Sequence, residues 1–349
     1  MQHFSLNTRL CFGENALSVL GELKPKRTLL VTDKFFSQNG KAQEILQLCG
    51  GEGKIFDGVQ PDPELSVVAQ GVKLLQEFSP DLLLALGGGS AIDCAKGILS
   101  MAKAAVPFVA IPTTSGTGSE VTSFAILTHE GIKHPLIEDK LRPEIAILDD
   151  ALLAELPKNL IADGGIDTVS HTLEALASKN ANSFTTALAE SAFRTCLELL
   201  PRSFAGDRSV RADLHQAATM AGIAFDGAGL GICHALSHAL GGAFHLPHGR
   251  LNAILLPHVM EFNLPATAAY KNLAEHCGFG SPRALIFALR RLRKQLSLPE
   301  TLSTAGLERN KVLPRLEELA ATAAKDPCLK TNPRPATESE LAALIRRVL

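Results

Sequence analysis

The sequence predicts two domains of different class: an α/β domain with a parallel sheet over residues 1–156, and an all-helical domain over residues 157–349. In the first half, short apolar runs alternate with helix-like segments, which is typical of βαβ units and a parallel sheet. From about residue 157 onward strand signals vanish and helical periodicity takes over. The length of 349 residues is enough for two hydrophobic cores of ordinary size.

Three runs in the first half are predicted to be strands, at residues 27–33, 54–59 and 81–86. The third is apolar after its first residue, as expected for a strand that is buried on both faces of a parallel sheet. Helical spacing follows the first and second runs, over 41–49 and 64–78. Because ligands bind outside the carboxyl ends of the strands in such folds, the residues that follow each strand are candidates for a binding site.

Two glycine-rich turns follow apolar runs, one at 87–90, which leads into a helix, and one at 112–120. Glycine lets the backbone approach a phosphate closely, and the free N–H groups of a helix start attract its negative charge. Neither turn matches G-x-G-x-x-G, and no phosphate-binding P-loop motif occurs. Together with Asp33 at the end of the first strand, the two turns favour a dinucleotide site in which Asp33 binds the ribose hydroxyls and repels a 2′-phosphate.

The second half is predicted to contain helices over 160–178, 183–200 and 211–225, the second ending before Pro201. The segment 231–258 then holds five of the eleven histidines. His234 and His238 lie one helical turn apart, and His248 follows a break at Gly241-Gly242.

Asp167 and His171 form a second pair with helical spacing. One carboxylate and three imidazoles from these residues predict a site for a divalent first-row metal. Cys233 is left out of the site because neighbouring residues of a helix point about 100° apart.

The composition excludes several classes of partner and location. The net charge of −2 gives no reason to expect nucleic acid or an anionic membrane as a partner. No apolar run approaches the ~20 residues of a membrane span, and the N-terminal segment lacks the pattern of a secretory signal. The seven cysteines contain no C-x-x-C motif, so reduced thiols and a cytoplasmic location are expected. The basic cluster at 290–294 is interpreted as a solvated helix face.

Four linked motifs then occur in order: GGGS-x2-D-x2-K at 87–96, PTT-x-GTGSE at 112–120, G-x-D-x3-H-x2-E at 165–174 and the histidine segment. This series resembles the iron-dependent (group III) alcohol dehydrogenase family, and the resemblance covers nearly the whole chain. Within that family the chain is most similar to the propanol dehydrogenases of bacterial microcompartments, from cues at 4–9, 244–249 and 329–335.

The resemblance implies a dehydroquinate synthase-like fold, with a nucleotide-binding α/β domain and a helical metal-binding domain. It implies Fe²⁺, with Zn²⁺ as the alternative, bound by Asp167, His171, His234 and His248. His238 lies outside this ligand set and is assigned to proton relay or nicotinamide positioning, the alternative being a packed structural histidine. The implied contacts to NAD(H) are Asp33, Gly88, Gly89, Ser90, Asp93, Thr113, Thr114, Thr117 and Lys133, while Asp62 stands where many members have Asn.

The expected activity is the interconversion of a short-chain primary alcohol and its aldehyde, with propanal/1-propanol and acetaldehyde/ethanol as the leading pairs. The resemblance makes Phe124, Phe225 and Cys328 candidates for an apolar pocket lining. Three alternatives stay open: a zinc-dependent polyol (glycerol) dehydrogenase, a dehydroquinate synthase-like lyase, and an inactive interaction protein. A homodimer or larger homo-oligomer is expected, with a bacterial microcompartment as a candidate location.

Overall fold

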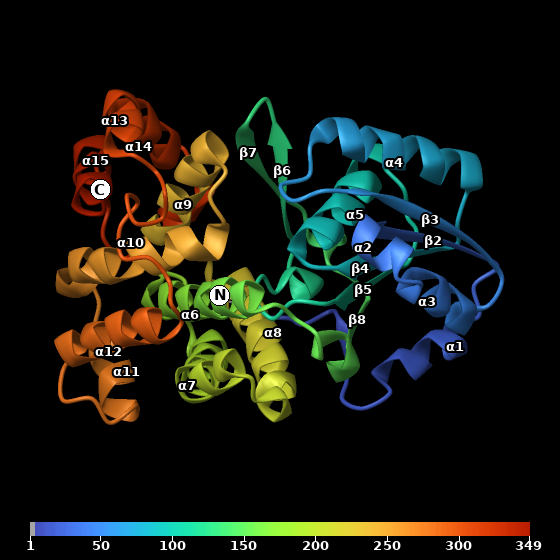
Figure 1. Ribbon diagram of the computed structural model, residues 1–349, viewed down its shortest axis with the longest axis horizontal. Coiled ribbons are helices and arrows are strands. Elements are labelled where there is room, and N and C mark those ends of the chain that lie inside the picture. The colour runs from blue at the N-terminus through green and yellow to red at the C-terminus, as the bar shows by residue number, and fades with distance from the viewer. Residues whose placement is uncertain (1–3) are drawn as a thin grey trace. The chain divides into compact units, whose positions relative to one another are not determined.

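The computed structural model describes residues 4–349, so residues 1–3 of the predicted first domain lie outside the described residues. The chain divides into two compact units, one ending at Leu156 and one spanning Pro157–Leu349 (Figure 1). The first unit combines a sheet with helices and the second is helical, so the predicted fold class is confirmed.

The first unit is built on a six-stranded sheet in the order β1-β8-β5-β4-β2-β3, in which every neighbouring pair is parallel. A separate antiparallel hairpin follows β5 in the chain and consists of β6 and β7. The strands are β1 (Arg9–Phe12), β2 (Arg27–Asp33), β3 (Glu52–Val59), β4 (Leu82–Gly87), β5 (Phe108–Pro112), β6 (Phe124–His129), β7 (Ile132–Ile137) and β8 (Ile145–Leu148).

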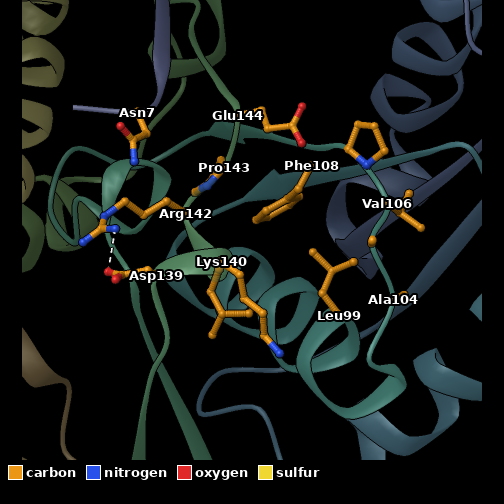
Figure 2. Close-up of a pocket in the computed structure, with 13 residues that line it drawn as sticks. Asn7, Leu99, Ala104, Val106, Phe108, Asp139, Lys140, Arg142, Pro143 and Glu144 are labelled. Atoms are coloured by element: carbon orange, nitrogen blue, oxygen red, sulfur yellow. Dashed lines mark hydrogen bonds and ion pairs between the residues drawn. The ribbon is translucent and has the colours of Figure 1, made fainter. Parts of the chain in front are cut away.

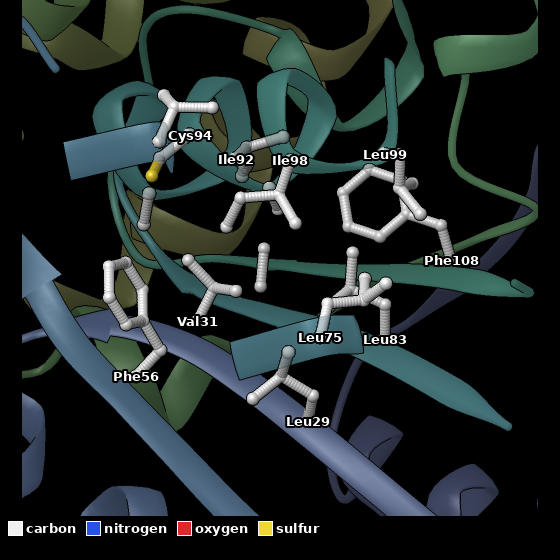
Figure 3. Close-up of a cluster of buried hydrophobic side chains, with 14 of the residues drawn as sticks. Leu29, Val31, Phe56, Leu75, Leu83, Ile92, Cys94, Ile98, Leu99 and Phe108 are labelled. Carbon is white, nitrogen blue, oxygen red and sulfur yellow. The ribbon is translucent and has the colours of Figure 1, made fainter. Parts of the chain in front are cut away.

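Helices cover both faces of the sheet because successive residues of each central strand point to opposite sides. Leu29 and Val31 of β2 pack with α4 and α5 on one face, in the cluster shown in Figure 3. Leu30, between them, packs with α1 and α3 on the other face. The helices of this unit are α1 (Leu20–Leu23), α2 (Lys34–Gln38), α3 (Lys41–Cys49), α4 (Leu65–Phe78) and α5 (Gly89–Ala102).

The second unit consists of helices α6 to α15, and the first five of them carry or support the predicted metal site. Those five are α6 (Lys158–Ala177), α7 (Ser183–Ala205), α8 (Arg211–Ala228), α9 (Ile232–Phe244) and α10 (His248–Asn263). The others are α11 (Ala269–His276), α12 (Pro282–Gln295), α13 (Arg309–Val312), α14 (Leu316–Ala324) and α15 (Glu338–Arg347). Short 3-10 turns connect several elements, among them η2 (Ser119–Val121), η5 (Arg208–Val210) and η8 (Pro327–Thr331).

Two predicted helix ends are wrong. Helix α7 continues through Pro201 and ends only at Gly206, whose φ of 113° suits glycine. Helix α9 continues through Gly241 and Gly242, which are buried, to Phe244. The break comes at His245, with φ of 55°, because Pro247 disfavours a helical residue before it and then precedes the first turn of α10.

Among the described residues, no single helix is both long and apolar enough to cross a membrane. The stretch Arg208–Ala228 and the helix Ile232–Phe244 meet the length and composition criteria only as a pair, with a bend of 105° between them.

Candidate functional site

The four predicted metal ligands come together within the helical unit. Asp167 and His171 lie one turn apart on α6, while His234 is in the first turn of α9 and His248 begins α10. The Nε2 atoms of His171, His234 and His248 lie 3.8, 3.8 and 3.5 Å from Oδ1 of Asp167. Three imidazole nitrogens therefore face one carboxylate oxygen.

This donor set fits a divalent first-row ion. The ligand atoms of Asp167, His234 and His248 all lie within 4.8 Å of one another, and the His171 ring stacks on His234 at 4.7 Å. Asp167 is 5%, His171 4% and His234 1% exposed, so water competes weakly for a bound cation. Imidazole nitrogen and carboxylate oxygen are ligands that both Fe²⁺ and Zn²⁺ accept.

The electrostatics of the cluster favour a positive charge beside Asp167. Burial alone would raise the pKa of the Asp167 carboxyl, but the three neighbouring imidazoles hold it well below its usual range. Burial would likewise lower the pKa of His234, yet the carboxylates of Asp167 and Glu174 raise it to about 9. Asp167 is therefore ionised at neutral pH and attracts whatever cation or proton the imidazoles share with it.

Glu174 contacts the cluster, although sequence reasoning gave it no role beyond closing the motif at 165–174. Its carboxylate accepts hydrogen bonds from the backbone N–H groups of Gly231 and Cys233, at 2.9 and 2.6 Å. It also lies 2.6 Å from Nδ1 of His234. Because the acceptor lies at Nδ1, the proton of a neutral His234 lies there too, and Nε2 keeps the lone pair that a metal requires.

Asn252 is a second residue that the sequence analysis missed. It lies one turn after His248 on α10, is fully buried, and donates from Nδ2 to Oδ1 of Asp167 at 2.7 Å. The same amide nitrogen is 3.2 Å from Nε2 of His248. Its position four residues after His248 would have placed it on the same helix face as that histidine, which was the sequence signal available. Cys233 packs its sulfur against Asn252, 3.6 Å from the side-chain oxygen.

His238 lies beside the cluster without facing Asp167. Its ring stacks on His248 at 5.2 Å, and its Nδ1 lies 2.8 Å from Oδ2 of Asp326. Of the predicted pocket residues, Phe225 stacks on His171 at 4.4 Å, and Cys328 is buried in a cluster with His238 and Asp326. Phe124 belongs to the first unit, where its carbonyl accepts a hydrogen bond from Lys96.

In the α/β unit, the two glycine-rich turns lie together because Gly87 and Pro112 are paired at the ends of β4 and β5. A Cβ added at Gly88 would lie 3.2 Å from Oγ1 of Thr114, and one at Gly89 would lie 2.7 Å from Cγ2 of Thr117. A side chain at 89 would therefore force Thr117 to shift, and one at 88 would press tightly against Thr114.

Ser90 follows Gly89 in the first turn of α5, where backbone N–H groups lack helical partners, and Thr113 directly follows β5. These features fit a phosphate group between the turns.

Lys96 and Asp93 anchor the second turn. The Lys96 ammonium group is fully buried and donates to the carbonyl oxygens of Ser119, Thr122 and Phe124, at 2.6, 2.8 and 2.6 Å. The Asp93 carboxylate accepts from Oγ of Ser119 at 2.6 Å and from the N–H of Ile126 at 2.9 Å. Burial raises the pKa of Asp93, which the charge of Lys96 partly offsets. Both oxygens of the Asp93 carboxylate are therefore hydrogen-bonded to the segment 119–126, and contact with a dinucleotide stays a prediction.

The two remaining predicted cofactor residues have local partners. Asp33 caps α2, where its Oδ1 accepts from the N–H groups of Phe35 and Phe36 at 2.9 and 3.3 Å. Lys133 on β7 forms an ion pair of 2.6 Å with Asp62. A contact of either side chain with a dinucleotide stays a prediction.

A surface pocket of about 480 Å³ lies at the opposite edge of the same sheet (Figure 2). It is lined by residues that precede β1, β5 and β8, such as Asn7, Pro107 and Glu144. The lining contains none of the predicted cofactor residues.

Comparison with known proteins decides the family. Residues 7–150 match the model for "Iron-containing alcohol dehydrogenase", and residues 161–349 match that for "Fe-containing alcohol dehydrogenase family, C-terminal". The chain belongs to the iron-containing alcohol dehydrogenase family. The predicted family and the predicted class of enzyme, an iron-dependent alcohol dehydrogenase linked to NAD, are confirmed.

The relatives agree over the full length of the chain. It is 38% identical over 370 residues to the 1-propanol dehydrogenase PduQ of Citrobacter freundii, and covers 100% of both chains. It is 34% identical over 386 residues to the NAD-dependent methanol dehydrogenase of Bacillus methanolicus, again covering 100% of both. An iron-containing alcohol dehydrogenase structure from Thermococcus thioreducens matches at a TM-score of 0.93 and 32% identity over 99% of each chain.

We predict that Lys96→Met destabilises the α/β unit, since it leaves three buried carbonyl groups without their donor and Asp93 without its compensating charge. The expected loss is about 3–5 kcal/mol in the free energy of unfolding, measured by urea denaturation. Lys73→Met, at an exposed lysine of α4, is the control and should stay within about 0.5 kcal/mol of the parent. Equal stability of the two variants would contradict the anchoring role.

We predict that Glu174→Gln weakens metal binding by about 10–100-fold, because the amide no longer fixes the proton of His234 at Nδ1. The measurement is anaerobic equilibrium dialysis against Fe²⁺ followed by elemental analysis. Glu198→Gln, at an exposed position of α7, is the control. Parent-like affinity in Glu174→Gln would contradict an orienting role for this carboxylate.

Proposed function

We propose that this chain interconverts a short-chain primary alcohol and its aldehyde, using NAD(H) and one divalent ion bound by Asp167, His171, His234 and His248. The observation that carries the proposal is the convergence of three imidazole nitrogens on one oxygen of Asp167, at 3.5 to 3.8 Å. Iron is the proposed occupant, in keeping with the family, and zinc is the competitor, because the donor set suits both.

The overall reaction is balanced as alcohol plus NAD⁺ giving aldehyde, NADH and one proton. A bound divalent cation would stabilise the negative charge that develops on the alcohol oxygen as its proton leaves, and bound NAD⁺ would accept the hydride from the carbinol carbon. In this proposal, Glu174 orients the His234 ring through Nδ1, and Asn252 orients the Asp167 carboxylate by donating to Oδ1. His238 is the proposed acceptor of the proton.

The dinucleotide is proposed to bind at the carboxyl ends of β2, β4 and β5. Its phosphates would lie on the closely packed turns, where Gly88 and Gly89 give the backbone access and the start of α5 supplies N–H donors. The full proposed set is Asp33, Gly88, Gly89, Ser90, Asp93, Thr113, Thr114, Thr117 and Lys133.

A short unbranched substrate is proposed because the side chains beside the histidines are apolar. The Phe225 ring covers His171, and Cys328 is buried beside His238. The additional hydroxyl groups of a polyol would be left there without partners, which costs free energy. The similarity to a 1-propanol dehydrogenase supports propanal/1-propanol, with acetaldehyde/ethanol as the second pair. A homo-oligomer and a microcompartment location stay predictions.

We predict that removal of the metal abolishes turnover. After anaerobic purification, the chain should hold about one iron per chain and oxidise NADH in the presence of propanal. Dialysis against a chelator should remove both the iron and the activity, and added Fe²⁺ should restore them. A chain that is folded and metal-free as purified, or whose activity survives chelation, would contradict the proposal.

We predict a preference for simple alcohols over polyols. The value of kcat/KM for 1-propanol should exceed that for glycerol by at least about 100-fold, because each unpaired buried hydroxyl costs about 1–3 kcal/mol. The measurement compares NAD⁺ reduction by ethanol, 1-propanol and glycerol with the same iron-loaded preparation. A zinc-containing protein that prefers glycerol would move the assignment to the polyol dehydrogenases.

A further inference from the structure

The segment 329–335, which contributes to the family resemblance, has no role in the chemistry proposed above. Thr331 ends η8 and Asn332 follows it, with only 1% of Asn332 exposed. These two residues contact the ends of α6, α9 and α10, the three helices that carry the proposed metal ligands. Just after α6, for example, the N–H of Lys179 donates to the carbonyl oxygen of Thr331 at 2.9 Å. The segment therefore joins the elements on which the proposed metal site depends.

The start of α9 contains N–H groups that have no partner within the helix and need acceptors from elsewhere. Glu174 accepts from the N–H groups on either side of Ile232, at 2.9 and 2.6 Å. The N–H of Ile232 itself donates to Oδ1 of Asn332 at 3.3 Å. The first residue of α9, two positions before the proposed ligand His234, is therefore held by Asn332.

Two contacts decide which way round the Asn332 amide lies. Its Nδ2 donates to the carbonyl oxygen of Arg334 at 2.7 Å, and a carbonyl oxygen can only accept. Oδ1 is thereby left for Ile232, whose N–H can only donate. Asn263, the last residue of α10, pairs with the same amide, since its Oδ1 accepts at 2.8 Å and its Nδ2 donates at 3.0 Å. Asn332 thus links the start of α9 to the end of α10.

The loop between α8 and α9 has the shape to receive this segment. Thr331 donates from Oγ1 to the carbonyl oxygen of Leu230 at 2.6 Å. A Cβ added at Gly229 would lie 2.6 Å from Oγ1 of Thr331, and one at Gly231 would lie 2.6 Å from Oδ1 of Asn332. The two glycines therefore allow the segment to approach the backbone that leads into α9.

We propose that Asn332, with Thr331 beside it, is a positioning residue, which holds the start of α9 so that the ring of His234 faces Asp167. The proposal rests on the function proposed above, because it takes His234 to be a metal ligand. Glu174 orients the ring through Nδ1, whereas Asn332 holds the backbone from which the ring extends. Within residues 4–349, none of the hydrogen bonds of Asn332 goes to a proposed ligand. Its effect on the metal site is therefore exerted through the position of the helix.

The decisive variant is Asn332→Leu, which has a similar size but neither donor nor acceptor. The full chain would be freed of metal by dialysis against a chelator and titrated with Co²⁺, which accepts the same imidazole and carboxylate ligands and whose visible absorption reports their geometry. We expect the Co²⁺ affinity to fall by about 10–100-fold and the visible bands to shift, because the ring of His234 is displaced. Parent-like affinity and absorption in this variant would overturn the proposal.

Asn332→Asp separates positioning from stability. Its carboxylate still accepts from Ile232 and from Nδ2 of Asn263, but it cannot donate to the carbonyl oxygen of Arg334, which costs stability. We expect a lower midpoint of urea denaturation together with parent-like absorption and a Co²⁺ affinity within about threefold of the parent. A loss of Co²⁺ affinity as large as that in Asn332→Leu would count against the proposal, because a general loss of stability would then explain both variants.

Asn310→Leu is the matched control, since Asn310 is an exposed residue of α13. It makes the same chemical change and should keep the Co²⁺ affinity and absorption of the parent. If its affinity falls as far as that of Asn332→Leu, the effect is not specific to position 332 and the positioning role is wrong.

Thr331→Val provides a milder test if Asn332→Leu folds poorly. It keeps the shape of the side chain and removes only the hydroxyl that donates to Leu230. The Co²⁺ affinity should fall in the same direction, by about 3–10-fold, and an unchanged affinity would overturn the role of the segment. An unmodified chain that binds no Co²⁺ would overturn the proposed metal site and the positioning role together. A parent that binds Co²⁺ no better than Asn332→Leu does would overturn the positioning role alone.

Discussion

The structure around the proposed metal centre depends on one buried carboxylate at the start of a helix. Glu174 is 3% exposed and closes the N-terminus of α9 by accepting from the N–H groups of Gly231 and Cys233. Those groups lack partners inside the helix, and their partial positive charge makes the site favourable for a carboxylate. The same carboxylate holds Nδ1 of His234. One interaction therefore joins α6 to α9 and orients a proposed ligand.

In the α/β unit, too, a buried charged side chain fixes distant backbone, but here the charge is positive and its partners are carbonyl groups. Lys96 is a buried cation surrounded by carbonyl oxygens of the segment 119–124, and Asp93, one turn earlier on α5, accepts from the same segment. Burying an unpaired charge costs free energy, so the buried positions of Lys96 and Asp93 are stable only while the segment 119–126 supplies their hydrogen-bond partners. In each unit, a buried charged side chain on a helix thus fixes a backbone segment that is distant in sequence. In the α/β unit this segment follows the predicted cofactor residues at 113–117, and in the helical unit it carries the proposed ligand His234.

Local patterns in the sequence predicted the fold class, because strand and helix periodicities depend on near neighbours. They also predicted the pairing of Asp167 with His171, since spacing of four on a helix is enough to place two side chains on one face. The role of Glu174 was not predictable in this way, because its partners lie 57 to 60 residues later and meet it only after α6 and α9 pack. Asp326 is separated from His238 by 88 positions and carries no spacing signal at all. The break at Gly241-Gly242 was wrong for a related reason: tertiary packing keeps both glycines helical.

Glu174 and Asp326 together suggest why α9 carries two histidines one turn apart. Each carboxylate lies at Nδ1 of one ring, at 2.6 Å for His234 and 2.8 Å for His238, so each ring in its neutral form holds its proton at Nδ1. Their Nε2 sides nevertheless face different surroundings, since Nε2 of His234 lies 3.8 Å from Oδ1 of Asp167, whereas the His238 ring stacks on that of His248. The Nε2 lone pair of His234 points to a carboxylate and other imidazoles, which favours its proposed role as a metal ligand. The Nε2 of His238 lies outside that group, which favours its proposed role in accepting a proton. The direction of each ring on the shared helix is thus set by a different carboxylate, that of Glu174 for His234 and that of Asp326 for His238.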